Sequence, residues 1–119
     1  MNVIVSKSKI FGSVCVPPSK SVAHRLMIAA MLAGDRLDVK DGGKDMCATA
    51  QCLEVIRNAM CSKTENNQNA HGKMELPILN ASESGSTLRF LLPIVCALGL
   101  ECVITGEGRL KYRPLGELV

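Results

Sequence analysis

Short strand-like runs alternate with longer helix-like segments along the chain, and this alternation constrains the fold more than any other feature. The strand-like runs, rich in β-branched residues, are 2–6, 12–17, 37–41, 76–80 and 100–106. The helix-like segments, with apolar residues at helical spacing, are about 19–34, 45–60 and 82–99. The polar stretch 62–75 is predicted to be a loop or an exposed hairpin. This order, β-β-α-β-α-loop-β-α-β, predicts an α/β fold, or α+β in some classification schemes.

The helical segments are predicted to bury aliphatic faces, because the chain has few aromatic residues to fill a core. The aromatic residues are Phe11, Phe90 and Tyr112. One stripe of the second helical segment consists of Met46, Thr49, Leu53, Ile56 and Met60. The matching stripe of the third segment consists of Leu88, Leu91, Leu92 and Val95. Gly34 is expected to end the first helix and Asp45 to cap the second.

Composition and charge exclude several classes of protein. The chain of 119 residues is 47% hydrophobic and 21% charged, as in an ordinary folded domain. A net charge of +3 without a basic stripe argues against a nucleic-acid partner. The longest apolar run, FLLPIVCALGL, is too short to span a membrane, and the start lacks the apolar region of a signal peptide. We therefore expect a cytoplasmic location and no membrane partner.

The six cysteines are predicted to be reduced and buried. They occupy positions 15, 47, 52, 61, 96 and 102, mostly in apolar surroundings. No pair has C-x-x-C spacing, and none lies near His24 or His71 in a metal-binding pattern, so no metal is expected. A disulfide framework or a zinc site is the alternative interpretation.

The start of the first helical segment concentrates cations and hydroxyls in the motif SKSVAHR. Ser21 and Arg25 are four residues apart and share a helix face, while Lys20 and His24 share the neighbouring one. Cations at a helix amino terminus oppose the helix dipole and cost about 0.3–1 kcal/mol each unless an anion binds there. The motif therefore favours a phosphate or carboxylate site. Alternatively, these residues are solvated surface groups beside a serine cap.

Two further stretches carry similar chemistry. In NASESGSTLRF, hydroxyl residues and the carboxylate of Glu83 surround Gly85, and Arg89 points back toward the same helix start. In GEGRLKYRP, the cations Arg109, Lys111 and Arg113 alternate, so an extended chain would place them on one side. A capping segment and an exposed charged loop are the alternatives. Together the three stretches predict a site for a small molecule with several negative charges, without a nucleotide motif or a nucleophile–base pair.

The segments PPSKSVAHRLMIAAMLAG, ESGSTLRFLLPIVCALG and GRLKYRPLGELV resemble three signature segments of the 5-enolpyruvylshikimate-3-phosphate (EPSP) synthase family, in the same order. The related UDP-N-acetylglucosamine enolpyruvyl transferases would be expected to carry Lys-Asn in place of Lys20-Ser21. That relative, a non-catalytic module that binds phosphate ligands, and a structural or interaction domain are the alternatives.

The resemblance implies an enzyme that moves the enolpyruvyl group of phosphoenolpyruvate to the 5-hydroxyl of shikimate 3-phosphate, in chorismate and aromatic amino acid biosynthesis. It implies no cofactor, and glyphosate as an inhibitor. By position in the motifs, Lys20 would be catalytic and contact both substrates. Ser21 and Arg25 would bind shikimate 3-phosphate, and Gly85 and Arg109 phosphoenolpyruvate. The supporting residues would be Ser86, Arg89, Lys111 and Arg113.

The resemblance also implies an inside-out α/β barrel domain of the enolpyruvyl transferase type, built from β-α-β-α-β-β units. Family members are several times longer and have a second, C-terminal domain that supplies the general acid and base. Residues 1–16 would pair with that domain, and 17–119 would form an incomplete N-terminal domain without turnover of its own. The uncapped end at Leu118-Val119 likewise indicates a fragment. Departures from the family pattern at Pro18, Glu83 and Ser86 put the pocket geometry in question, because Glu83 adds a negative charge.

Overall fold

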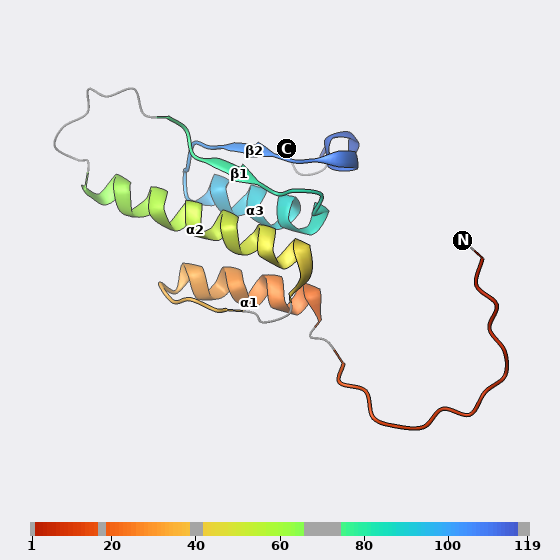
Figure 1. Cartoon of the computed structure of the whole chain (residues 1–119). Helices are drawn as coiled ribbons and strands as arrows, with labels where there is room; N and C mark the ends of the chain where they lie inside the picture. Colours follow the sequence, from red (N-terminus) through yellow and green to blue (C-terminus); the bar gives the residue numbers. More distant parts are fainter. Residues whose placement is uncertain (1, 17–18, 39–41, 66–74, 117–119) are drawn as a thin grey trace.

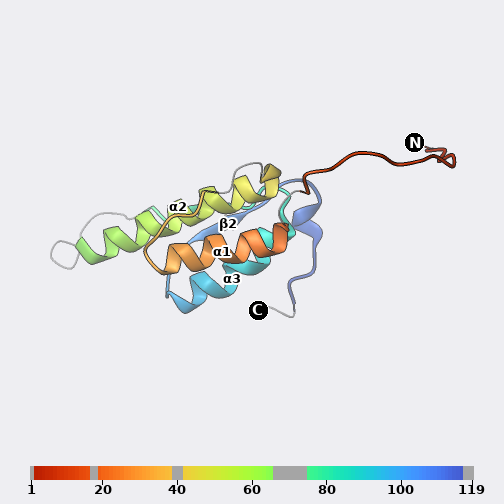
Figure 2. The same ribbon diagram turned by 90° about the horizontal axis from the view of Figure 1, so that it is seen from below.

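A computed structural model describes residues 2–16, 19–38, 42–65 and 75–116 and places three helices on one face of a small sheet (Figure 1). The elements are α1 (Lys20–Leu32), α2 (Gly43–Glu65), β1 (Ile78–Asn80), α3 (Gly85–Ala97), β2 (Val103–Thr105) and the 3-10 helix η1 (Gly108–Tyr112). Helices α2 and α3 cover the sheet, and α1 packs on the side of these helices that faces away from the strands (Figures 1 and 2). The mixed helix and strand content agrees with the predicted α/β class.

The sheet consists of β1 and β2, which pair in parallel and are connected through α3. Ile78 lies opposite Val103, and Asn80 lies opposite Thr105. A helix that connects two parallel strands runs against their direction, so its amino end lies beside their carboxyl ends. This topology places the start of α3 next to the turns that follow Asn80 and Thr105.

The core is aliphatic, as predicted, and lies between the helices and the sheet. Its centre consists of Ile56, Leu79 and Leu91, all of them 0% exposed. The predicted stripe of α2 is buried at Met46, Thr49, Leu53 and Ile56, whereas Met60 is exposed. In α3, Leu91 and Val95 are buried, and Leu88 and Leu92 are partly buried. None of the helices within the described part of the chain is both long and apolar enough to cross a membrane.

Glycine ends both α1 and α3. Gly34 and Gly99 have φ angles of 78° and 57°, a left-handed conformation that side chains other than hydrogen disfavour. After α1, the amides of Gly34 and Asp35 donate to the carbonyls of Met31 and Ala30. Such bonds satisfy carbonyls that the end of a helix would otherwise leave free. The predicted end of the first helix at Gly34 is therefore confirmed.

The strands predicted at 2–6 and 12–17 are absent from the described residues. Residues 2–16 form an extended arm that leads away from the helices and sheet (Figures 1 and 2). Its large apolar side chains are exposed, among them Ile4 at 91% and Ile10 at 94%. A strand forms only when a neighbouring strand accepts its backbone hydrogen bonds, and no described segment lies beside the arm.

Other differences concern the segments around α2. Residues 37 and 38 have no regular structure, and residues 39–41 of the predicted third strand lie outside the described residues. Helix α2 starts at Gly43 and extends to Glu65, so it includes the beginning of the predicted loop 62–75. The rest of that loop, 66–74, lies outside the described residues. The observed strands Ile78–Asn80 and Val103–Thr105 fall within the runs predicted at 76–80 and 100–106.

The prediction of buried cysteines is wrong for most of them. All six thiols are free; Cys52 is buried, Cys102 is partly buried, and Cys15, Cys47, Cys61 and Cys96 are exposed. Cys47, Cys61 and Cys96 lie outside the apolar stripes of their helices, and Cys15 lies in the extended arm, so an apolar local sequence was not enough to predict burial. Burial raises the pKa of the Cys52 thiol from 9.0 to about 11, and its Sγ donates to the carbonyl of Asn80 at 3.3 Å.

Alkylation of the native chain should therefore spare Cys52. The raised pKa leaves much less thiolate, the form that reacts, near neutral pH, and burial also keeps the reagent from the Cys52 sulfur. Iodoacetamide labelling followed by mass spectrometry should show modification of Cys47 long before Cys52, and unfolding in urea should remove the difference. Equal labelling of both residues in the folded chain would contradict the packing of Cys52.

Candidate functional site

The amino ends of α1, α2 and α3 lie at the same end of the molecule, together with η1 and the carboxyl ends of the two strands (Figures 1 and 2). We refer to this region, formed by residues 19–25, 43–49, 82–89 and 106–113, as the helix-start end. Each helix start presents free N–H groups and about half a positive charge. Three such starts together create a region suited to anions.

Lys20 and Arg25 of α1 both contact neighbouring helices at the helix-start end. The Nζ of Lys20 lies 3.3 Å from Oδ2 of Asp45 in the first turn of α2, and both side chains are partly exposed to solvent. The guanidinium carbon of Arg25 lies 5.5 Å from the centre of the Phe90 ring in α3, a cation–π distance. Ser21 is exposed on the same helix. The sequence places the positive charge of Lys20 at the positive end of the α1 dipole. The carboxylate of Asp45 offsets this unfavourable interaction.

The role predicted for Asp45 as a helix cap is wrong. Helix α2 begins two residues earlier, at Gly43, so Asp45 lies in its first turn. There the Asp45 carboxylate binds Lys20 across the helix interface. No local sequence pattern indicates this pairing, because the two residues are 25 positions apart.

Arg113 packs directly on Gly85 at the start of α3. A Cβ atom added to Gly85 would lie 2.5 Å from an Nη atom of Arg113, so a larger residue at position 85 would require the exposed Arg113 side chain to move. Arg113 follows η1, whose residues Arg109 and Lys111 are exposed. The condition for placing these three cations on one side, an extended chain, is not met, because residues 108–112 form a 3-10 helix with three residues per turn. All three side chains are exposed, as the alternative of an exposed charged segment expects.

The turns after β1 and β2 are joined by hydrogen bonds beside Gly85. Ser82 has a φ of 50°, unusual for a residue with a side chain, and its amide donates to Oδ1 of Asn80 at 2.8 Å. The amide of Glu107 donates to the carbonyl of Ser82 at 2.6 Å. Glu83 lies against Gly108, where an added Cβ would overlap its carboxylate. These contacts fix the position of η1 relative to the start of α3.

Three carboxylates gather in a groove at one side of the helix-start end. Asp45, Glu83 and Glu107 line it together with Lys44. The charge of Glu83, expected at the Gly85 pocket, thus faces the start of η1 and this groove. Within the described residues, no group of three or more histidine, cysteine or acidic side chains is arranged to hold a metal ion.

A buried polar chain runs beneath the helix-start end. His24 Nδ1 lies 2.8 Å from the hydroxyl of Thr49, which lies 2.7 Å from the hydroxyl of Thr87. The Thr87 hydroxyl lies 2.7 Å from that of Ser84, which also accepts the Thr87 amide as the cap of α3. His24, Thr49 and Thr87 are at most 1% exposed. The sequence indicates Thr49 only as a member of an apolar stripe and groups Ser84 with Thr87 only as hydroxyl residues around Gly85, so it does not connect them to Thr49 or His24.

Comparison with known proteins supports the resemblance seen in the sequence. The sequence model of the family described as EPSP synthase (3-phosphoshikimate 1-carboxyvinyltransferase) matches residues 4–119. The chain belongs to the EPSP synthase family. This membership supports a fold of the enolpyruvyl transferase type. No solved structure matches the chain.

Several members of the EPSP synthase family, named 3-phosphoshikimate 1-carboxyvinyltransferase, align with nearly all of this chain. The protein of Clostridium kluyveri is 38% identical over 95% of the chain, and that of Brachyspira hyodysenteriae 34% over 97%. The protein of Methanosarcina mazei is 35% identical over 100%. The chain spans 28–29% of the length of these three relatives.

The helix-start end contains all the residues that the resemblance to EPSP synthases predicts to form the site. Lys20, Ser21 and Arg25 lie at the start of α1, and Gly85, Ser86 and Arg89 lie in the first turns of α3. The remaining residues, Arg109, Lys111 and Arg113, lie in η1 or directly after it. Of these residues, Arg113 lies against Gly85 and so connects the segment after η1 to the start of α3.

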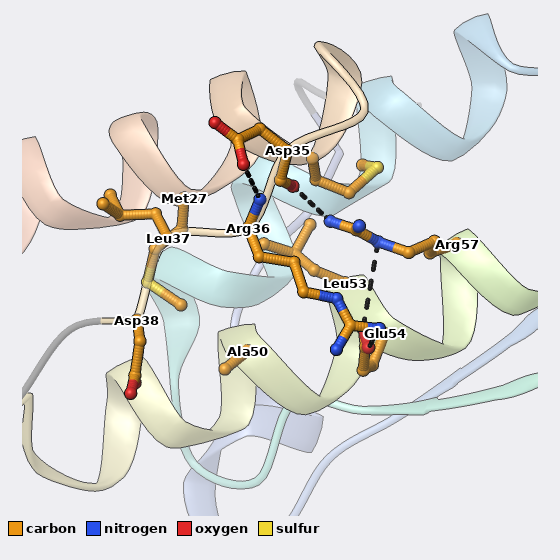
Figure 3. A pocket seen from close by; sticks show the side chains of 10 residues that line it. Met27, Asp35, Arg36, Leu37, Asp38, Ala50, Leu53, Glu54 and Arg57 are labelled. Carbon is orange, nitrogen blue, oxygen red and sulfur yellow. Dashed lines mark hydrogen bonds and ion pairs between the residues drawn. The ribbon is translucent and has the colours of Figure 1, made fainter.

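A separate pocket lies near the carboxyl end of α1 and contains none of the predicted site residues (Figure 3). Its floor includes Met27 and Leu53, and charged side chains surround it. Arg36 lies 2.6 Å from a carboxylate oxygen of Glu54, and Arg57 donates to the carbonyl of Asp35. These interactions hold the segment after α1 against α2, so we assign the pocket a structural role.

Acidification should weaken the fold through His24. Burial lowers the pKa of His24 from 6.5; the nearby charge of Asp45 raises it and that of Lys20 lowers it further, but burial has the largest effect. Below pH 6.5 the unfolded chain therefore binds a proton that the folded chain resists, so the free energy of unfolding falls as the pH drops. The decline should stop below the pKa of His24 in the folded chain.

Urea unfolding between pH 7.5 and pH 5 measures this effect. A His71→Asn background removes the other histidine, which lies outside the described residues. In that background, His24→Asn should flatten the pH dependence. A free energy of unfolding that stays constant or rises between pH 7 and pH 5 before this substitution would contradict the burial of a neutral His24.

Proposed function

We propose that this chain forms the N-terminal part of a 3-phosphoshikimate 1-carboxyvinyltransferase and carries one half of its substrate site. The reaction moves the enolpyruvyl group of phosphoenolpyruvate to the 5-hydroxyl of shikimate 3-phosphate and releases phosphate. The observation that carries the proposal is the convergence of three helix starts with Lys20, Arg25 and Arg113 at one end of the molecule. The names of the aligned relatives support the same reaction.

In this proposal, α1 binds shikimate 3-phosphate. Lys20, Ser21 and Arg25 offer an ammonium group, a hydroxyl and a guanidinium at one helix start, and all three are exposed to solvent. Hydrogen bonds between such cations and phosphate oxygens are about twice as strong as neutral ones. Because the Arg25 guanidinium already lies over the Phe90 ring, it is oriented before the ligand arrives.

The start of α3 and the region of η1 bind phosphoenolpyruvate in the same proposal. Gly85 leaves room for the Arg113 guanidinium beside the free amides of α3, where an anionic group would bind, and Arg109 pairs with the phosphate or carboxylate. Lys20 contacts both substrates and acts in catalysis by stabilising the charge that develops between them. The supporting cations and hydroxyl are Ser86, Arg89, Lys111 and Arg113. Glyphosate would compete with phosphoenolpyruvate at this position.

In this proposal, the chain alone binds the substrates but does not convert them, because a second domain supplies the general acid and base. Residues 17–119 belong to an incomplete barrel domain of α/β units, and residues 1–16 pair with the second domain. The exposed apolar side chains of the arm support this pairing, since strand-forming residues such as Ile4 and Ile10 lack a partner within the described chain. We propose a cytoplasmic enzyme without a metal or organic cofactor.

Titration of the chain with shikimate 3-phosphate, followed by amide chemical shifts, tests the proposal. We expect shifts at residues 19–25. Lys20→Ala should weaken binding about 10–100-fold, the effect of one lost hydrogen bond between a cation and phosphate. Lys9→Ala is the matched control, because it removes the same charge from the exposed arm and should leave the affinity unchanged.

Two outcomes would decide against the proposal. A folded chain without shifts at residues 19–25, up to millimolar ligand, would show that α1 is not the binding surface. A chain that binds UDP-N-acetylglucosamine but not shikimate 3-phosphate would instead favour the related enolpyruvyl transferase.

A further inference from the structure

The buried chain of polar side chains connects all three helices that contribute to the helix-start end. His24 comes from α1, Thr49 from α2, and Thr87 with its cap residue Ser84 from the start of α3. Each link has a donor–acceptor distance of 2.7 or 2.8 Å. Buried hydrogen bonds of this kind fix relative positions more tightly than apolar packing does, because a small displacement leaves a polar group unsatisfied.

This polar chain ends at groups that belong to the substrate site. Ser84 directly precedes Gly85, and its hydroxyl holds the first turn of α3 through the Thr87 amide. The hydroxyls of Thr49 and Thr87 lie 3.2 and 3.3 Å from the carbonyl oxygen of Asp45, and the carboxylate of Asp45 holds Lys20. A shift of the threonine hydroxyls would therefore move both the start of α3 and the residue that orients Lys20.

His24 lies at one end of this series of hydrogen bonds, where its side chain can orient the hydroxyl groups of the other members. Each threonine hydroxyl has a single proton, so the direction of the bond at His24 influences which neighbour each threonine can donate to. The imidazole is 1% exposed and also packs beside Phe90, with ring centres 6.0 Å apart. Phe90 in turn supports the Arg25 guanidinium. His24 thus touches the supports of the α1, α2 and α3 parts of the site while remaining out of contact with solvent.

We infer that His24 is a positioning residue for the anionic substrates: through Thr49, Thr87 and Ser84 it sets the spacing between Lys20 on α1 and Gly85 on α3. This inference rests on the proposed function for the identity of the ligand. It assigns a role to a buried histidine that does not itself contact substrate.

Replacement of His24 by leucine and by asparagine tests the inference. Leucine fills much of the space but offers no partner to Thr49, whereas asparagine places an amide group near the position of Nδ1. We expect His24→Leu to weaken binding of shikimate 3-phosphate about tenfold, the effect of one hydrogen bond, and His24→Asn to restore most of it. Ile56→Val is the control, because it destabilises the core without touching the polar chain.

Two readouts separate this inference from the proposed function. Without ligand, His24→Leu should shift the amide signals of Asp45 and Gly85, and His24→Asn should shift them less. Unchanged signals, or equal binding by the parent chain and a folded His24→Leu variant, would overturn the positioning role. An equal loss of affinity in Ile56→Val would also overturn it, since stability alone would then explain the effect. A parent chain that fails to bind would contradict the proposed function, and the amide signals would still decide the role of His24.

Discussion

Leu91→Ala should lower the free energy of unfolding by about 2–5 kcal/mol, the usual cost when a fully buried leucine leaves a cavity. Leu91 is 0% exposed and belongs to the cluster that joins α3 to α1, α2 and the sheet. A domain of this size is stabilised by about 5–15 kcal/mol in total, so the loss is a large fraction of its stability.

Leu26→Ala is the matched control for this prediction. Leu26 also lies in the middle of a helix, but it is 53% exposed on α1, so the same substitution removes little buried surface. We expect a change within about 0.5 kcal/mol, as for other surface substitutions. Urea unfolding of both variants measures the difference. Similar losses at the two positions would mean that the packing of α3 onto the other helices is not the main source of stability.

The helices could be predicted from the sequence because their signals are local. The apolar spacing of Leu53 and Ile56, and the left-handed glycines Gly34 and Gly99, act within a few residues of each position. The site residues of α1 and α3 could likewise be placed at helix starts from their motifs. The motifs alone therefore predicted that Lys20 and Gly85 each lie at the start of a helix.

What could not be predicted depends on partners that are distant in the sequence. The arm at residues 2–16 has the pattern of strands, but strands require a neighbour, and none of the described segments provides one. The pairing of Lys20 with Asp45 and the contact of Arg113 with Gly85 both depend on how separate elements pack. Alternation would place Arg109, Lys111 and Arg113 on one side if the chain were extended, but the chain after Glu107 forms a 3-10 helix.

The buried polar chain of His24, Thr49, Thr87 and Ser84, beneath the candidate site, could not be predicted for the same reason. Thr49 follows the apolar periodicity of α2, so its pattern predicted burial correctly but gave no indication of a hydrogen-bond partner. Thr87 was one of several hydroxyl residues around Gly85. Only packing of α2 against α3 shows that these two hydroxyls face each other within the interior.

Thr87→Val should therefore destabilise the chain by about 1–3 kcal/mol, although valine has nearly the same shape as threonine. The Thr87 hydroxyl contacts those of Thr49 and Ser84 and the carbonyl of Asp45, and the residue is 0% exposed. Removing it leaves buried polar groups with fewer partners, and each unsatisfied group costs about 1–3 kcal/mol. Thr105→Val is the control, because Thr105 is exposed in β2, where valine is at least as favourable as threonine.

A double-mutant cycle with Thr49→Val measures the interaction between the Thr49 and Thr87 hydroxyls directly. Each single variant leaves the other threonine with a missing partner, whereas the double variant removes both hydroxyls and lets two methyl groups pack together. The double variant should therefore lose less stability than the sum of the two single variants, by about 0.5–3 kcal/mol, as expected for residues in one network. Urea unfolding of the four chains measures this coupling. Strictly additive losses would mean that the 2.7 Å contact between Thr49 and Thr87 contributes no hydrogen bond to the fold.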